Sequence, residues 1–226
     1  MPLLEIRNLK KIYRTPEGET LTVLDVTEFA LEAEQQLALR GASGTGKTTF
    51  LNCIAGILRL NAGRVMIDGT DMASASEGRR DRLRAQNIGY IFQTFNLLQG
   101  YTCLDNVLLG MRFGPGADRE FALGLLKRVG LSDRLDYRPG QLSVGQQQRV
   151  AVARALANKP KLVLADEPTG NLDPKNAREA IKLIREICRE TGAALLIVSH
   201  DQTVLELFDV CADLAEINLA MQEMAP

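Results

Sequence analysis

The sequence predicts an α/β fold with a mostly parallel sheet, and three observations support this. The chain has 226 residues, which is enough for one large α/β domain. Short apolar runs alternate with longer amphipathic segments, and a glycine-rich loop joins one apolar run to one such segment. Because strands that alternate with helices pair in parallel, the loops at their carboxyl ends are expected to hold a ligand.

Each element is predicted from its local pattern. Strands are predicted at Leu3–Ile6, Val23–Leu31, Leu37–Leu39, Arg64–Ile67, Ile88–Phe92, Lys161–Ala165 and Ala194–Ser199. Helices are predicted at Lys47–Leu58, Leu104–Met111, Arg119–Val129, Gln146–Ala157, Lys175–Glu190 and Thr203–Phe208. The helix before Thr191 is the clearest, because Ile181, Ile184 and Cys188 share one face and Pro174 stands at its first turn.

A helical subdomain is predicted at residues 77–141, inside a single domain that spans residues 1–226. This segment is rich in helical pattern, charged at its start, and broken by the turn residues of Gly114–Asp118. The chain has no internal repeats and no low-complexity segments.

Composition and charge narrow the possible functions. The net charge of −1 gives no overall field that favours nucleic acid or an anionic membrane surface. The N-terminus lacks a signal-peptide pattern, and the longest apolar stretches, such as Ala193–Val198, are too short to span a bilayer. The four cysteines are scattered and there is one histidine, which argues against a zinc site. We therefore expect a cytoplasmic protein with reduced thiols.

The strongest motif is a phosphate-binding loop between a predicted strand and a predicted helix. It matches G-x-x-x-x-G-K-[ST] and consists of Gly41, Ala42, Ser43, Gly44, Thr45, Gly46, Lys47 and Thr48, followed by Thr49. Glycines let successive backbone N–H groups turn toward phosphate oxygens, and the helix adds the positive end of its dipole. Lys47 is expected on the β- and γ-phosphates, and the Thr48 hydroxyl on Mg²⁺. The alternative is a glycine-rich turn that caps a helix.

Two carboxylates end a buried strand downstream of this loop. Asp166 is expected to hold Mg²⁺, either directly or through water, and Glu167 to polarise or position the attacking water. Without the upstream loop, the pair would be interpreted as a solvated acidic turn before Pro168. Together with that loop, they predict nucleotide hydrolysis.

His200 and Gln93 each end a strand-like apolar run. His200 could reach the γ-phosphate or the attacking water, and a surface histidine with satisfied hydrogen bonds fits the sequence equally well. Gln93 could join the network of Mg²⁺ and water, or it could cap a loop. Position in the sequence leaves both alternatives open.

The segment Leu142–Arg149 resembles the signature sequence of ABC transporter ATP-binding subunits. From the residues alone, Ser143 and Gln146 form a capping box that opens a helix, and a helix N-terminus is an anion site in its own right. The resemblance covers essentially the whole chain. It implies a P-loop NTPase fold with a mostly parallel sheet, an antiparallel β subdomain and an inserted helical subdomain.

The resemblance also implies roles for single residues and for a second copy of the chain. Tyr13 would stack on adenine, Gln93 would form the Q-loop, residues 171–173 the D-loop, and His200 the switch histidine. Two copies would pair head to tail, with Ser143, Gly145 and Gln146 of one meeting the γ-phosphate of ATP held by the other. Glu167 would then be the general base, with ATP and Mg²⁺ as the bound groups.

Within the family, Tyr90–Leu98 and Ala165–Asp173 look most like the lipoprotein-release and macrolide-export (LolD/MacB-like) branch. The polar segment Arg14–Thr20 also fits. This branch implies an integral membrane subunit, a periplasmic adaptor in some systems, and a peripheral location on the inner face of the plasma membrane. Phe95, Leu97 and Leu98 are candidates for the surface that docks the membrane subunit, and packing within the helical subdomain is the alternative for each.

Two departures from the family pattern stand out. Val144 occupies a position where the family usually has glycine, so the backbone angle there is either ordinary or strained. Residues 212–226 lack the glycine-rich hairpin that is usual after the switch histidine, which leaves the last strands open and argues against an appended regulatory domain.

Other function classes explain less of the sequence. Soluble ABC ATPases that act on ribosomes or DNA typically carry two such domains or a long coiled-coil insertion, and this sequence has neither. A P-loop small-molecule kinase would not account for the signature segment, Asp173 and His200 together. A binding-only module is disfavoured because Glu167 is present.

Overall fold

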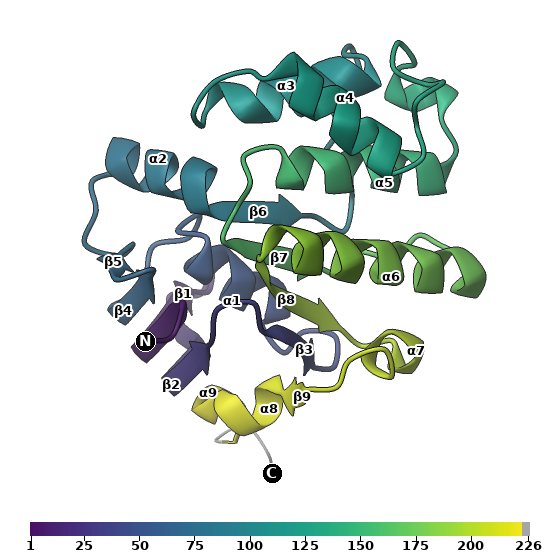
Figure 1. The fold of residues 1–226 in the computed structure, drawn as a ribbon. Helices are drawn as coiled ribbons and strands as arrows, with labels where there is room; N and C mark the ends of the chain where they lie inside the picture. Colours follow the sequence, from purple (N-terminus) through teal and green to yellow (C-terminus); the bar gives the residue numbers. More distant parts are fainter. Residues whose placement is uncertain (223–226) are drawn as a thin grey trace.

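The computed structural model describes residues 1–222, in which a parallel and an antiparallel sheet contribute to one apolar core (Figure 1). The parallel sheet has the strand order β6-β7-β8-β3-β9, with bounds β3 (Gln36–Arg40), β6 (Ile88–Ile91), β7 (Leu162–Asp166), β8 (Ala194–Ser199) and β9 (Cys211–Asp213). The antiparallel sheet has the order β2-β1-β4-β5, with bounds β1 (Leu4–Arg14), β2 (Thr20–Leu31), β4 (Ala62–Ile67) and β5 (Thr70–Asp71). The predicted α/β class is confirmed.

The helices form two groups around the parallel sheet. Their bounds are α1 (Lys47–Ile54), α2 (Glu77–Asn87), α3 (Cys103–Arg112), α4 (Arg119–Arg128), α5 (Val144–Leu156), α6 (Pro174–Thr191), α7 (Gln202–Leu205), α8 (Leu214–Ile217) and α9 (Leu219–Gln222). Helices α3, α4 and α5 lie together on one side of the molecule, and α1 lies on the other face of the parallel sheet (Figure 1).

Alternate residues of the central strands feed two separate cores. On β8, Leu195 and Ile197 join the core that includes α5 and α6. Leu196 and Val198 point to the other face and pack with α1 and the antiparallel sheet. A parallel strand covered on both faces is apolar at every position, which is why this run was recognisable in the sequence.

The helix-rich segment 77–141 is not helical throughout. Its residues Ile88–Ile91 form β6, which pairs with β7 from Ile88↔Leu162 to Ile91↔Ala165. The parallel sheet therefore takes one edge strand from inside the predicted subdomain. We propose that the helical subdomain begins after β6 and includes α3 and α4.

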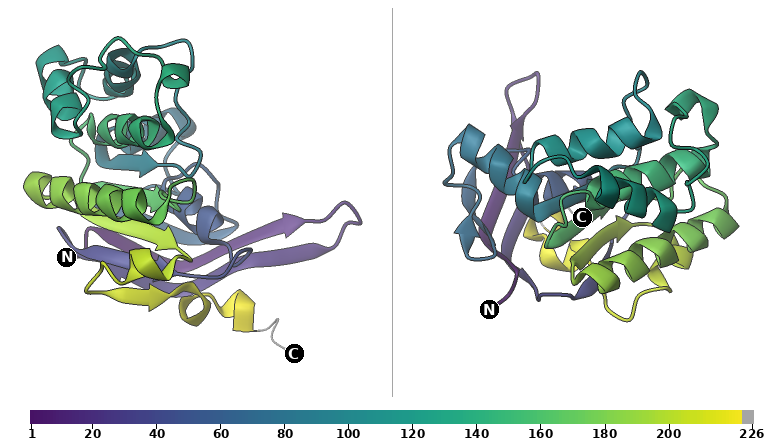
Figure 2. Two further views of the ribbon diagram at one scale, coloured as in Figure 1. Left: turned by 90° about the vertical axis from the view of Figure 1, so that its right-hand side faces the viewer. Right: turned by 45° about the horizontal axis from the view of Figure 1, so that its top comes forward.

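Strands β1 and β2 form a long hairpin that extends away from the body of the molecule (Figure 2). Pairing continues to Arg14↔Thr20, well past the predicted end of the first strand at Ile6. Residues near the tip are exposed or half-buried on both faces. With no buried face, the sequence there has no alternation that could have signalled a strand.

The region after His200 adds a short parallel strand, β9, and small helices instead of a hairpin. The buried side chain of Asn218 closes the edge of β2, because its Oδ1 accepts a hydrogen bond from Asp25 N (2.8 Å) and its Nδ2 donates one to Val23 O (2.9 Å). Of the C-terminal segment left open by the sequence, residues 223–226 lie outside the described part.

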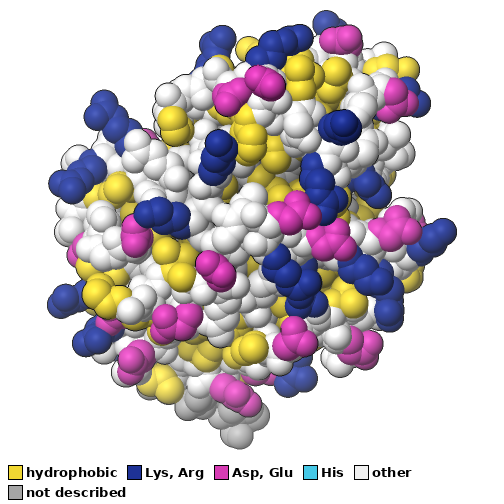
Figure 3. Space-filling view, viewed as in Figure 1, with side chains coloured by type: hydrophobic (Ala, Val, Ile, Leu, Met, Phe, Trp, Pro, Cys, Tyr) yellow, Lys and Arg dark blue, Asp and Glu magenta, His cyan; other side chains and the backbone are white. Residues whose placement is uncertain are grey.

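The surface shown in Figure 3 mixes Lys and Arg with Asp and Glu over the helices and the strand ends alike. This agrees with a net charge of −1. Among residues 1–222, no helix combines the length and the apolar character that crossing a membrane requires.

Candidate functional site

The glycine-rich loop connects β3 to α1, as the motif requires. Strand β3 ends at Arg40 and helix α1 begins at Lys47. Gly44 and Gly46 have φ angles of 83° and 89°, in the left-handed region that glycine adopts without steric cost. A Cβ on Gly46 would also lie 3.1 Å from Leu24 Cδ2. The loop bends as it does because these positions carry no side chain.

The ammonium group of Lys47 is nearly enclosed at the base of this loop. Its Nζ donates hydrogen bonds to the carbonyls of Gly41 (2.7 Å) and Ala42 (3.0 Å). It also lies 3.2 Å from Glu167 Oε1, and the side chains of this ion pair are 8% and 9% exposed. Salt screens a buried pair of this kind much less than a surface pair.

Glu167 directly follows β7 in a backbone conformation that non-glycine residues seldom adopt. Its φ is 44°, and its N–H donates a hydrogen bond to Val198 O on β8 (3.0 Å). Its Oε1 lies 2.7 Å from His200 Nδ1, and its Oε2 accepts a hydrogen bond from the Ser199 hydroxyl (3.2 Å). The end of β8 and Lys47 together therefore orient this carboxylate.

Asp166, the last residue of β7, is 4% exposed, and its Oδ1 has no hydrogen-bond partner among the described residues. Burial raises the pKa of this carboxyl, and a side-chain hydrogen bond with Thr48 acts in the opposite direction. Carboxylate and hydroxyl oxygens are ligands that suit Mg²⁺, which takes its other ligands from phosphate and water. This pair of residues therefore fits a magnesium ion.

Gln93 comes shortly after β6 and lines the same pocket. The pocket has a volume of about 320 Å³, and its walls are Val23, Ser43, Gly44, Gly46, Lys47, Thr48, Thr49, Gln93, Glu167 and His200. The Gln93 carbonyl accepts a hydrogen bond from Asn171 Nδ2 (3.0 Å). Larger pockets lie elsewhere, but this one is lined by the phosphate-binding loop and by the predicted residues Gln93, Glu167 and His200.

The signature segment is not part of this pocket. The predicted capping box is present: Ser143 Oγ accepts a hydrogen bond from Gln146 N (3.3 Å), and Gln146 Oε1 accepts one from Ser143 N (3.0 Å). Val144 is the first residue of α5, lacks a positive φ and is 45% exposed, so its backbone angle is ordinary and its side chain meets water. A Cβ on Gly145 would meet no atom within 4 Å.

Two further predicted residues also lie apart from the pocket. Tyr13 is on the extended hairpin, 38% exposed, with Lys11 Nζ lying 4.9 Å from the centre of its ring. Asp173 caps α6, and its Oδ1 accepts a hydrogen bond from Asn176 N (3.1 Å). These contacts describe the single chain.

Sequence reasoning missed two residues that hold the loop of Glu167. Ser199 is completely buried and contacts the carboxylate, as described above. Gln148 of α5 is 1% exposed and donates a hydrogen bond from Nε2 to the carbonyl of Pro168. Ser199 is the one polar residue of an otherwise apolar strand, and that was the signal that could have identified it. Gln148 stands in the polar run of residues 146–149, where nothing in the local pattern singles it out.

Comparisons with known proteins identify the family of this chain. The family model described as "ABC transporter" matches residues 24–170. The chain is 37% identical to the lipoprotein-releasing system ATP-binding protein LolD 2 of Caulobacter vibrioides, over 99% of both chains. It is 44% identical to LolD 2 of Rhodospirillum rubrum, over 90% of both chains.

Solved structures show the same fold. The chain superposes on the dimeric ATP-binding cassette MJ0796 bound to ADP and Pi with a TM-score of 0.85 and 34% identity, over 93% of each chain. The match to the family model, the full-length relatives and the shared fold lead to one conclusion: this chain belongs to the ABC transporter family, and it is an ATPase of that family's ATP-binding cassette type.

Proposed function

We propose that this chain hydrolyses ATP to drive a membrane subunit of the lipoprotein-releasing or macrolide-exporting kind. The observation that carries the proposal is the cluster of Lys47, Glu167 and His200 at the phosphate-binding loop. Support for the kind of transporter comes from the relatives called lipoprotein-releasing system ATP-binding protein. It also comes from MacB of Syntrophobacter fumaroxidans, a macrolide export ATP-binding/permease protein. This chain is 39% identical to MacB over 91% of this chain and 29% of the length of MacB.

The charges in the pocket suggest how ATP would change it. In the structure, Lys47 neutralises Glu167. An incoming triphosphate carries more charge than one carboxylate, so the ammonium would transfer to the β- and γ-phosphates. That transfer removes one of the two contacts of Glu167 Oε1, so a lone pair of this oxygen could accept a proton from water, while His200 and Ser199 keep the carboxylate in place. The remaining loop residues, from Gly41 to Thr49, would bind the phosphates.

Mg²⁺ would be held by Thr48, Asp166 and Gln93. When bound, the ion neutralises charge on the phosphate oxygens during transfer. The unpartnered Oδ1 of Asp166 supports this assignment, because a buried carboxylate oxygen without a partner is costly unless it meets a cation.

A second copy of the chain would complete the site from the opposite side. The N-terminus of α5 carries Ser143, Gly145 and Gln146, and it opens toward free space. A helix N-terminus with its backbone N–H groups directed outward binds anions. In a head-to-tail dimer this end would meet the γ-phosphate held by the partner, and Tyr13 would stack on adenine. The dimeric MJ0796 structures support such a pairing.

The membrane subunit would dock beside β6. A groove of about 470 Å³ lies there, and its apolar walls include Ile57, Tyr90, Phe92 and Phe113. Phe113 is 69% exposed. This surface replaces part of the docking site expected from the sequence, because two of the three apolar residues predicted to dock the membrane subunit are buried in the core.

Burial separates Phe95 and Leu97 from Leu98. Phe95 and Leu97 are each 7% exposed and belong to the core around α3 and α5, so they were wrong as docking residues. Leu98 is 41% exposed and remains a candidate. Through this face the chain would lie on the inner side of the plasma membrane, with a periplasmic adaptor as a further component of the system.

The experiment that tests the proposed function is Lys47→Ala. We expect nucleotide affinity and phosphate release to fall together by about a hundredfold or more, because the ammonium contacts the charge that develops during transfer. The exposed Lys182→Ala on α6 is the matched control and should behave as the wild type. Unchanged affinity and turnover in Lys47→Ala would exclude this pocket as the ATP site.

A further inference from the structure

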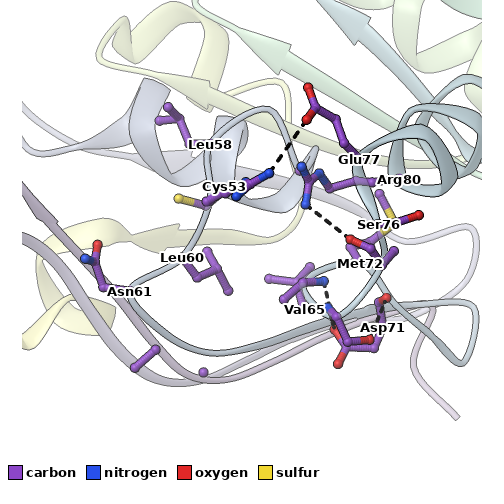
Figure 4. A pocket seen from close by; sticks show the side chains of 17 residues that line it. Cys53, Leu58, Leu60, Asn61, Val65, Asp71, Met72, Ser76, Glu77 and Arg80 are labelled. Carbon is purple, nitrogen blue, oxygen red and sulfur yellow. Dashed lines mark hydrogen bonds and ion pairs between the residues drawn. The ribbon is translucent and has the colours of Figure 1, made fainter.

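A second pocket, of about 480 Å³, lies at the C-terminal end of α1, opposite the end that carries the phosphate-binding loop (Figure 4). An eight-residue helix is about 12 Å long, so the two sites are separate. The second pocket is enclosed by the segment after α1, by β4 and β5, and by the start of α2. None of the residues assigned to nucleotide binding lines it.

The notable residue in this pocket is Arg80, whose side chain extends from α2 toward its centre (Figure 4). Arg80 is 9% exposed, and its guanidinium makes one long hydrogen bond, from Nη1 to the carbonyl of Ala75 (3.4 Å). The Nε atom of Arg80 is buried without a hydrogen-bond partner, and the Arg80 side chain makes no ion pair within residues 1–222. A buried charge in this condition is unfavourable unless an anion meets it.

The backbone is shaped to admit this side chain. Gly56 has a φ of 65°, and a Cβ there would lie 2.6 Å from Arg80 Cδ. Any other residue at position 56 would displace the aliphatic part of Arg80. The arginine therefore occupies space that the fold reserves for it.

The acidic groups that face the pocket are engaged elsewhere. Asp71 Oδ1 accepts hydrogen bonds from the backbone N–H groups of Ala73 (2.8 Å) and Ser74 (3.4 Å). Glu77 lies 3.7 Å from Arg59, and both of these side chains are about three-quarters exposed. Of the two arginines in the lining, Arg59 and Arg80, only Arg80 has no ion pair within the described part of the chain.

A helix N-terminus adds donors beside Arg80. Ser76 is the N-cap of α2, an 11-residue helix, and its side chain makes no capping hydrogen bond. The N–H groups of the first helical turn have no partner within the helix, and they favour an anion. The lining also includes two half-buried leucines, Leu58 and Leu60, which present apolar surface to the pocket.

We propose that this pocket binds a small amphiphilic anion, with its carboxylate or phosphate head on Arg80 and the first turn of α2 and its short apolar body on Leu58 and Leu60. The volume lies in the ordinary range for small-molecule sites. Burial raises the pKa of the Cys53 thiol in the same wall to about 11, so the thiol stays protonated and the pocket binds its ligand without covalent chemistry.

The test is a titration of the full chain, with Mg²⁺-ATP present to keep the nucleotide site filled. The probes are octanoate, octyl phosphate, octanol and inorganic phosphate, and the readouts are calorimetric affinity and Tm. We expect octanoate or octyl phosphate to bind and to raise Tm, and the stronger of the two identifies the head group. Arg80→Met should weaken that binding about tenfold or more, because a charge-assisted contact is lost.

The control is Arg79→Met, which removes the neighbouring exposed arginine and should bind the probe as the wild type does. Without any probe, Arg80→Met should unfold at a Tm equal to or above that of the wild type, since it removes an unpaired buried charge.

Octanol binding as tightly as the anions, or equal affinity in the wild type and Arg80→Met, would overturn the proposal. If inorganic phosphate bound as tightly as octyl phosphate, the claim that the ligand has an apolar body would be wrong. If neither octanoate nor octyl phosphate bound, the whole proposal would be refuted. ATP hydrolysis, measured in parallel, reports separately on the proposed function.

Discussion

The phosphate-binding pocket and the N-terminus of α5 both carry residues expected to meet ATP, yet the two regions are built in opposite ways. In the pocket, Lys47 neutralises Glu167, His200 contacts the same carboxylate, and Lys47 and Glu167 are almost completely buried. At the start of α5, Ser143 caps its own helix and Gly145 opens toward empty space.

The difference shows which half of the site a single chain can complete. A buried charge without a partner is costly, so Lys47 and Glu167 pair within the chain, and only the buried Oδ1 of Asp166 is left for a cation in this pocket. The exposed helix end is satisfied by water and by its own capping box, and it leaves its remaining donors available.

The largest effect is expected from Glu167→Gln. The amide keeps the shape of the side chain but cannot accept a proton, so phosphate release should fall by about a hundredfold or more while ATP still binds. If the second copy completes the site, ATP should also convert this variant to a dimer on size-exclusion chromatography. The exposed Glu120→Gln in α4 is the control. A rate within a few-fold of the wild type would contradict the role of Glu167.

A similarly large effect is expected from Gly145→Asp, although a Cβ at this position would meet no atom outside its own helix. A carboxylate at the helix N-terminus would repel the γ-phosphate of the partner and lower ATP turnover by about tenfold to a hundredfold. Circular dichroism and Tm should remain those of the wild type. Gly124→Asp, in an equally open position on α4, should leave turnover unchanged. Equal turnover in the two variants would refute assembly of the site in trans.

The docking face is tested by a pair of neighbouring leucines. Leu98→Glu places a charge on an exposed side chain and should uncouple transport from hydrolysis while basal ATPase activity persists. Leu97→Glu buries a charge in the core and should lower Tm strongly, by an amount that corresponds to several kcal/mol. The measurements are substrate release in reconstituted vesicles, ATPase rate and Tm. If Leu98→Glu lost basal activity and transport equally, a role in folding would be the better explanation.

A smaller effect is expected from pH on Asp166. Because burial raises the pKa of this carboxyl in the folded state above its ordinary value of 3.8, the folded state binds the proton more tightly than the unfolded state. Stability should therefore be lost as pH rises from about 4 through the raised pKa. Asp166→Asn removes this penalty, so without Mg²⁺ its Tm should exceed that of the wild type by a few degrees near neutral pH and not at pH 4. A constant difference across this range would contradict the assignment.

The smallest effect is expected from Val144→Gly. Val144 already has an ordinary backbone angle at the first position of α5, so glycine relieves no strain there and costs up to about 1 kcal/mol of helix stability. ATP turnover should change by less than about tenfold. A rise of several hundredfold would show that valine impairs the native signature segment.

Local pattern was sufficient wherever a residue acts through its own backbone neighbourhood. The phosphate-binding loop, the capping box at Ser143 and the strand that ends at Asp166 were all predicted from adjacent residues, and the structure has each of them. Pattern was insufficient at the tip of the β1–β2 hairpin, where no face is buried. It was also insufficient at Leu97 and Leu98, because one of these adjacent leucines is buried and the other is exposed.

The class of fold, the phosphate-binding loop and the acidic strand end could be predicted from residue pattern alone, because hydrophobic periodicity and glycine spacing are local properties of the chain. The tertiary structure decided what distant residues do to one another: that Lys47 pairs with Glu167, that Ser199 and His200 orient that carboxylate, and that Arg80 is buried without an anion. These outcomes depend on strand order and on burial, and both are fixed only when segments far apart in the sequence pack together.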